Sequence, residues 1–203
     1  MTSRKKVGGL ALLIGIPILI LLFLQNFGQQ HYIVPTDPAE AEGLSAEVPA
    51  GSLGKPFSPV TSLIDRQGNS VANDLLLGKQ TIVFPLRKAD TDTAQAVLEQ
   101  LTRVQDVFEQ QKDVQLLVVT SEAELARLSS LAERYRSQPG RWRFLADTTQ
   151  KSPLVGLLPL GTSSSTVMLV DQDQRIRGYY DGIQEDEIDR LLVETRILRF
   201  GVE

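Results

Sequence analysis

A run of 18 residues without a polar side chain, Val7 to Leu24, constrains this chain more than any other feature of its sequence. As an α-helix the run would be about 27 Å long, close to the hydrocarbon thickness of a bilayer. Pro17 lies inside the run, and helices in lipid tolerate proline better than soluble helices do. The sequence therefore predicts one transmembrane helix over residues 7–24.

Charges on either side of the run predict its direction. A basic cluster occupies residues 4–6, and no Lys or Arg follows the run until Lys55. By the positive-inside rule, residues 1–6 are predicted to form a cytoplasmic tail. The part of the chain that follows the helix is predicted to lie on the opposite side of the membrane. A cleaved signal peptide is the main alternative, but residues 24–27 (LQNF) lack the small-residue pattern of a cleavage site.

Residues 25–54 have the composition of a flexible acidic linker. They contain no Lys or Arg, but four carboxylates and three prolines. Such a segment buries too little apolar surface to fold by itself. His31, the only histidine of the chain, lies here. One imidazole without partners makes a poor metal site, so we interpret it as a solvated residue.

Residues 55–203 alternate between strand and helix patterns and predict a single α/β domain. The strand-like segments are 57–64, 81–85, 114–119, 141–146, 166–171 and 175–180. Helical patterns begin near residues 92, 121 and 184, with a shorter one at 151–158, whereas residues 71–77 fit neither pattern. The order of these segments predicts a mixed sheet with helices on both faces.

Local signals indicate where the helices begin. Asp92 with Gln95, and Ser121 with Glu124, have the spacing of capping boxes. The last helix carries acidic residues in its first turn, at 185–187, where they favour the helix dipole. Its inner face is predicted to consist of four apolar residues: Ile188, Leu191, Leu192 and Leu198.

Composition excludes several classes of function. The chain has no cysteine, which removes disulfides, thiolate metal sites and thiol nucleophiles. Its net charge of -4 argues against nucleic acid as a partner. A Ser/His/Asp site would have to use His31 in the linker, and the sequence has no glycine-rich phosphate loop. We therefore expect a binding protein that is not an enzyme.

Three stretches in chain order resemble the Sco/SenC family. The first is residues 57–71, with LIDRQGNSV at its end, which also resembles the start of peroxiredoxin and TlpA domains. The second is Leu101-x-x-Val104-Gln105 with Phe108, and the third is Thr166 to Asp171 followed by RGYYDG at residues 177–182. The resemblance covers roughly Leu53 to Leu198. It implies a thioredoxin-like mixed sheet flanked by helices, as a Sco/SenC-type domain over residues 55–203.

The resemblance also implies a site, and this chain lacks its ligands. Sco proteins bind copper through two cysteines and a histidine and assist the assembly of cytochrome c oxidase. Those positions fall on Asp90, on Ala94 and near Ser163. Cu(I) prefers soft thiolate, thioether or imidazole donors, and none of these three residues supplies one. We therefore expect a redox-inactive member without catalytic, cofactor or metal residues.

The same resemblance implies partners and a location. A scaffold of this kind would bind an oxidase subunit or a cysteine-bearing Sco paralogue. It would lie in the inner membrane, with its N-terminus in the cytoplasm and its domain on the periplasmic side. An assembly role for the respiratory oxidase is the function that we expect first.

An alternative function uses the charged loop after the second strand. Arg87, Lys88, Asp90 and Asp92 could together bind a small anion or a hard cation. The hydroxyl-rich residues 162–166 could add oxygen ligands. Solvated loop charges and a loop that enters a strand explain both stretches more simply.

Overall fold

The structure is a computed structural model that describes Ile16 and residues 53–57, 63–71, 73–148 and 163–200. The chain divides into two units, Met1–Ile33 and Val34–Glu203. Within the described residues, no helix is long and apolar enough to cross a membrane. Apart from Ile16, which is helical, the predicted anchor lies outside these residues, as do His31 and almost all of the predicted linker. Anchor and linker therefore stay predictions.

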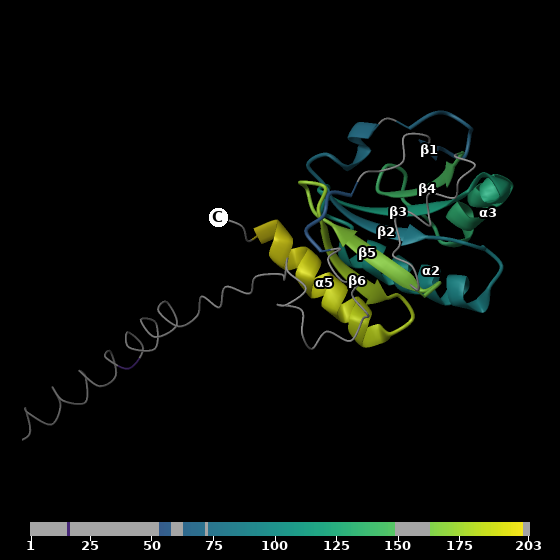
Figure 1. The fold of residues 1–203 in the computed structure, drawn as a ribbon. Helices are drawn as coiled ribbons and strands as arrows, with labels where there is room; N and C mark the ends of the chain where they lie inside the picture. The colour runs from purple at the N-terminus through teal and green to yellow at the C-terminus, as the bar shows by residue number, and fades with distance from the viewer. Residues whose placement is uncertain (1–15, 17–52, 58–62, 72, 149–162, 201–203) are drawn as a thin grey trace, which may run out of the picture. The chain divides into compact units, whose positions relative to one another are not determined.

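The folded unit is built on a six-stranded sheet with the order β1-β4-β3-β2-β5-β6 (Figure 1). The central strands β2, β3 and β4 run parallel, while β1, β5 and β6 pair antiparallel to their neighbours. The predicted mixed sheet is therefore confirmed. The strands are β1 (Leu63–Ile64), β2 (Gln80–Pro85), β3 (Val114–Ser121), β4 (Trp142–Asp147), β5 (Thr166–Val170) and β6 (Ile176–Asp181).

Three α-helices and two short 3-10 helices complete the described fold. They are η1 (Asn73–Leu76), α2 (Asp92–Val107), η2 (Glu122–Glu124), α3 (Leu125–Arg134) and α5 (Glu185–Phe200). The ambiguous stretch at 71–77 thus forms η1, and the short helix predicted at 151–158 lies outside the described residues.

Side chains alternate between two cores, one on each face of the sheet. Ile82 and Phe84 of β2 join a core with α2, α3 and α5, whereas Val83 between them joins the opposite core. Both crossovers from β2 to β3 and from β3 to β4 step in one direction, and right-handed crossovers then place α2 and α3 on one face. The described part of the other face is covered by η1 and residues 53–57.

Both predicted capping boxes are wrong in detail. Thr91, not Asp92, caps α2, because its Oγ1 accepts a hydrogen bond of 3.1 Å from the backbone N–H of Ala94. Asp92 is the first helical residue, where its charge still favours the dipole. Ser121 makes no capping bond and ends β3, so that α3 begins only at Leu125, after η2. The predicted inner face of α5 is confirmed, since all four apolar residues are buried.

The sheet ends in two irregular edges. β1 has only two residues, and it pairs with β4 through Leu63 and Ile64. At the other edge, the pairing of β6 with β5 shifts register between Leu169 and Val170. β6 also carries two charged residues, Arg177 and Asp181, along its short length.

Candidate functional site

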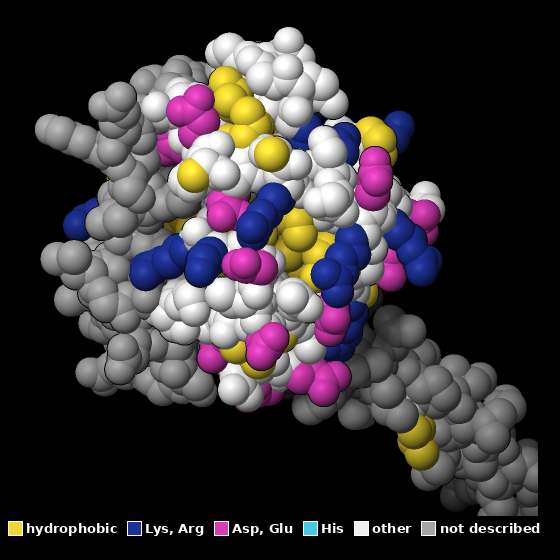
Figure 2. All heavy atoms as spheres, turned by 90° about the vertical axis from the view of Figure 1, so that its right-hand side faces the viewer, with side chains coloured by type: hydrophobic (Ala, Val, Ile, Leu, Met, Phe, Trp, Pro, Cys, Tyr) yellow, Lys and Arg dark blue, Asp and Glu magenta, His cyan; other side chains and the backbone are white. Residues whose placement is uncertain are grey.

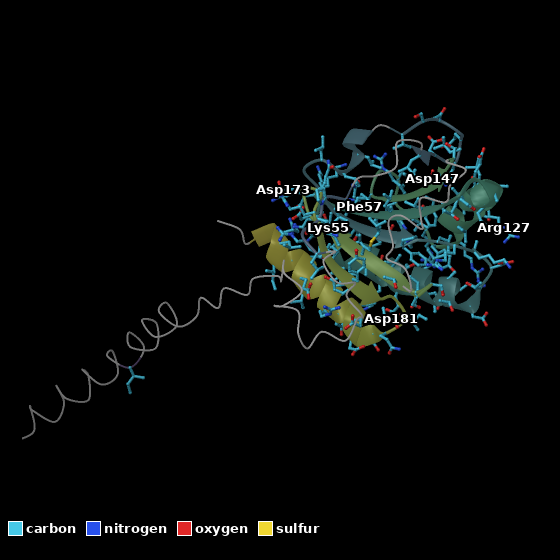
Figure 3. All side chains as sticks on the ribbon, viewed as in Figure 1. Lys55, Phe57, Arg127, Asp147, Asp173 and Asp181 are labelled. Carbon is cyan, nitrogen blue, oxygen red and sulfur yellow. The ribbon has the colours of Figure 1, made fainter. Side chains whose placement is uncertain are left out.

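The residues that the resemblance singled out gather around the loop that follows β2. Parallel pairing places the carboxyl ends of β2 and β3 at the same end of the sheet. Two hydrogen bonds fix the start of the loop, from the Leu86 N–H to the Val119 carbonyl (2.8 Å) and from the Thr120 hydroxyl to the Leu86 carbonyl (2.7 Å). We call this the loop end of the domain. Figure 2 views the domain from the side on which Arg127 projects in Figure 3.

Asp90, at the first expected ligand position, is engaged by a cation of the chain itself. Its carboxylate lies 3.3 Å from the Arg127 guanidinium of α3, and Arg127 also approaches Glu124 at 3.5 Å. The backbone N–H of Asp90 and then the Arg127 guanidinium hold the pKa of this carboxyl below its usual value. Asp90 is therefore an ionised partner of Arg127. Arg127 was not among the residues predicted for this site, although its spacing of three from Glu124 is a signal for a helix-surface ion pair.

Ala94 and Ser163, the other two positions, also have structural roles. Ala94 is 3% exposed and its side chain belongs to the core beneath the helices. The Ser163 hydroxyl lies 2.8 Å from that of the buried Ser165, and β5 begins at Thr166. The interpretation of this stretch as a loop entering a strand is thus confirmed for residues 163–166, whereas Thr162 lies outside the described residues.

The charged loop does not form a compact ion site. Arg87, Lys88, Asp90 and Asp92 are all exposed, and Figure 2 shows basic and acidic side chains intermixed on this side. In the described parts of the chain, no three carboxylate or histidine side chains are placed to share a metal ion. Because Asp90 is already paired with Arg127, the geometry does not favour the anion or hard-metal alternative.

The RGYYDG stretch forms a buried polar cluster with α5, which the sequence analysis missed. The fully buried Tyr180 hydroxyl donates a 2.6 Å hydrogen bond to Glu194. Arg190 lies over the Tyr180 ring at 4.5 Å, bonds Glu187 at 2.6 Å and approaches Glu194 at 3.6 Å. It also donates to the Tyr179 carbonyl at 2.9 Å. The spacing of Glu187, Arg190 and Glu194 by three and four residues was the available signal.

Burial controls the protonation of this cluster. It raises the pKa of the Glu194 carboxyl, and the Tyr180 hydroxyl and Arg190 oppose that shift only in part. Burial, followed by the neighbouring Glu194, raises the pKa of Tyr180 well above its ordinary value. The cluster thus joins one strand to one helix and is closed to solvent, which makes it a structural element.

Two glycines of the same stretch are required by close packing. A Cβ on Gly178 would lie 2.7 Å from Cζ of Tyr180, whose ring folds back along the strand. A Cβ on Gly182 would lie 2.8 Å from the Ser165 carbonyl oxygen and 2.8 Å from Val97 of α2. Gly182 therefore allows the end of β6 to pack closely against both α2 and the loop before β5.

The glutamine of the second motif has a structural role as well. Gln105 on α2 is buried, and its amide oxygen accepts from the Gln138 N–H at 2.8 Å. Its amide nitrogen donates to the Arg136 carbonyl at 3.3 Å. Arg136 has a positive φ of 49°, an uncommon backbone state for a residue with a side chain. Gln105 therefore holds the connection between α3 and β4.

Known proteins match this chain in structure and not in sequence. No family model and no curated protein matches this sequence. A Sco1/SenC family lipoprotein from Bacillus anthracis str. Ames has a TM-score of 0.56 at 14% identity, over 71% of this chain and 98% of that chain. The fold is that of the Sco/SenC proteins.

Two further Sco structures agree. The copper-bound ScoI of Bradyrhizobium japonicum has a TM-score of 0.51 at 16% identity, covering 70% of this chain and 98% of its own. Yeast Sco1 has a TM-score of 0.51 at 19% identity, covering 71% and 98%. At these sequence identities, a structural match shows the fold alone. The resemblance indicated by the three motifs is therefore confirmed for the fold.

Proposed function

We propose that this chain is a membrane-anchored Sco-type protein that binds a protein partner and performs neither thiol nor copper chemistry. One observation carries the proposal. The described residues form the six-stranded mixed sheet, while Asp90 is paired with Arg127 and Ala94 is buried at the positions where the resemblance expects cysteines. These two positions offer a soft metal ion no suitable donor, which supports a role in binding a protein over a role in binding copper.

The partner that fits best is an oxidase subunit or a cysteine-bearing Sco paralogue. A structural neighbour is described as a member of the Sco family of cytochrome c oxidase assembly proteins. The predicted anchor at residues 7–24 would place the domain on the periplasmic side of the inner membrane, next to such partners. In this proposal the protein is a scaffold and not an enzyme.

The loop end supplies the contact surface. Lys88 and Arg127 are exposed cations there, from the loop after β2 and from α3. Charges at the rim of an interface steer the encounter and select the partner more than they add affinity. Reversing both should therefore weaken capture of an acidic partner surface without unfolding the domain.

Purification of the full-length protein from membranes in a mild detergent tests the proposal. Mass spectrometry and haem absorbance should detect oxidase subunits or a Sco paralogue in the wild-type sample. The double variant Lys88→Glu/Arg127→Glu should lose them. Arg134→Glu/Arg196→Glu, which changes the net charge equally at two other exposed positions, should retain them. Recovery of the wild-type protein alone, or with one equivalent of copper, would overturn the proposal.

A further inference from the structure

Basic residues gather at the end of the sheet opposite the loop end. Lys79 directly precedes β2, Lys112 lies two residues before β3, and Arg141 directly precedes β4. The parallel register pairs Gln80 with Val114 and sets Leu116 beside Trp142. All three cations therefore lie at the amino end of the parallel strands.

The β5–β6 hairpin and the start of the domain lie at this end too. Val170 pairs with Thr81, so β5 ends where β2 begins. Arg175 in the hairpin donates to the Gly54 carbonyl at 3.1 Å, and the Ile176 N–H donates to the Lys55 carbonyl at 3.1 Å. Residues 54 and 55, near the start of the described part of the domain, thus lie at this end. In Figure 3, Lys55 and Asp173 lie at one end of the domain and Arg127 at the other.

Positive charge predominates here. The Asp113 carboxylate is paired with Arg199 at 2.6 Å, and the buried Asp171 is paired with Arg177 at 2.5 Å. Among the described side chains, Glu109 and Asp173 are exposed carboxylates at this end, and Asp106 and Glu133 lie in the last turns of α2 and α3. The cations at this end are Lys55, Lys112 and Arg175, which are exposed, and Lys79 and Arg141, which are half-buried.

An exposed apolar side chain accompanies these cations. Leu77 is 59% exposed, more than any other large apolar side chain of the described residues. It lies two residues before Lys79, and the neighbouring Gly78 N–H donates to the Gln172 carbonyl of the hairpin at 3.3 Å. Apolar groups surrounded by Lys and Arg are typical of protein surfaces that bind at the headgroup region of a bilayer.

We propose that this end of the domain docks on anionic phospholipid headgroups. The surface consists of Leu77 with Lys55, Lys79, Lys112 and Arg175, and the bilayer is the one that holds the predicted anchor, so the inference rests on the proposed function. The docked domain turns the opposite end, with Lys88 and Arg127, away from the lipid. A tether that allows free tumbling would expose every face equally, whereas the docked domain presents the loop end to a partner.

The absence of cysteine allows a direct test on the full chain. Gln172→Cys places a single thiol in the basic end, and Ile183→Cys places one after β6, at the loop end. Each labelled protein is reconstituted into vesicles of phosphatidylcholine alone, or of equal parts phosphatidylcholine and phosphatidylglycerol. The vesicles carry an energy-transfer acceptor on their headgroups.

The expected result has three parts. Transfer from residue 172 exceeds transfer from residue 183 in anionic vesicles, falls in neutral ones, and falls again at high salt, because salt screens the attraction. Each basic charge removed lowers the equilibrium constant for docking by about fivefold. Lys55→Glu/Lys112→Glu therefore abolishes the lipid dependence, whereas Lys88→Glu/Arg127→Glu preserves it.

Equal transfer from both labels, or transfer that ignores lipid charge, would overturn the docking surface and leave the anchor intact. Flotation of the protein with vesicles distinguishes failure of the docking surface from failure of the membrane anchor. A chain that floats only with anionic vesicles has the docking surface but no anchor, which would contradict the proposed function alone. A chain that floats with neither vesicle would contradict both.

Discussion

The strand–helix pair β6–α5 and the loop after β2 both contain residues that the family resemblance singled out, and they differ in kind. In β6–α5, the residues that match the family pattern are buried and make specific contacts, as Tyr180 does with Glu194. At the other region, the expected ligand positions hold Asp90 of the loop, which is exposed, and Ala94 of the first turn of α2, which is buried in the core. The contrast shows that packing accounts for the motif residues of β6. A match to these motifs therefore indicates a shared fold and does not indicate a shared metal site.

The largest expected effect comes from filling the space at Gly182. Gly182→Ala should lower the free energy of unfolding by about 3 kcal/mol, because the new methyl group meets the Ser165 carbonyl oxygen, which cannot move as a flexible side chain could. Urea unfolding followed by circular dichroism measures it. Gln184→Ala, two residues away and exposed, is the control and should change little. A wild-type midpoint for Gly182→Ala would show that the two regions are not packed as described.

A somewhat smaller loss is expected when the buried hydrogen bond is broken. Tyr180→Phe leaves the buried Glu194 carboxyl without its 2.6 Å partner and should cost about 2 kcal/mol. Adding Glu194→Leu removes the unsatisfied carboxyl group and should recover part of the lost stability. A double-mutant cycle on urea midpoints measures the coupling. Simple additivity of the two changes would contradict the role of this bond.

The next largest effect is expected in the pH dependence of stability, to which Glu194 of the β6–α5 pair contributes. Burial raises the pKa of Glu194, so the folded chain holds that proton more tightly than the unfolded chain does. Its contribution to stability is complete below the ordinary value of 4.5 and is lost as pH rises through the folded pKa. Glu194→Gln keeps an oxygen acceptor without the charge and should remove this loss.

Urea unfolding at a series of pH values above 4.5 measures the difference between the variant and the wild type. Taking the difference cancels the opposite trend from Asp65 and Asp113, whose pKa values are lowered in the fold. Glu133→Gln, at an exposed position of α3, is the matched control. Parallel curves for the Glu194→Gln variant and the wild type would show that Glu194 does not titrate as the geometry indicates.

The smallest effect is expected from restoring thiols in the loop. Asp90→Cys/Ala94→Cys supplies two soft donors, but the second would lie in the core with Ala94 at 3% exposure. We expect no stoichiometric Cu(I) binding by competition with a chromophoric chelator. Tight binding by this double variant would mean that the loop differs from a copper site by its side chains alone.

Much of the fold was predictable because its signals are local. The apolar runs of β2 and β3 and the stripe along α5 identify their elements without knowledge of their partners. Starts of helices were less certain, since Thr91 and Asp92 both offer a capping oxygen and only the backbone decides between them. Ser121 shows the same limit, because tertiary pairing with Asp147 of β4 keeps it in a strand.

The site was less predictable because its contacts cross the chain. Asp90 and Arg127 are brought together by the packing of α3 beside the loop, which no spacing in the sequence encodes. Tyr180 and Glu194 meet across the β6–α5 turn, and each alone has the pattern of an ordinary strand or helix residue. The prediction that the hydroxyl-rich stretch is a loop entering a strand is confirmed for residues 163–166, because that signal is local.

The irregular edges of the sheet have a consequence for copies of this chain that meet one another. A long, flat edge strand offers unpaired backbone groups to a second sheet and so invites aggregation. Here one edge is a strand of two residues, and the other has a register shift beside it and charges at Arg177 and Asp181. Neither edge provides a straight template for backbone pairing with a second sheet. We therefore expect that copies of this chain do not form fibrils by edge-to-edge pairing, even at high concentration.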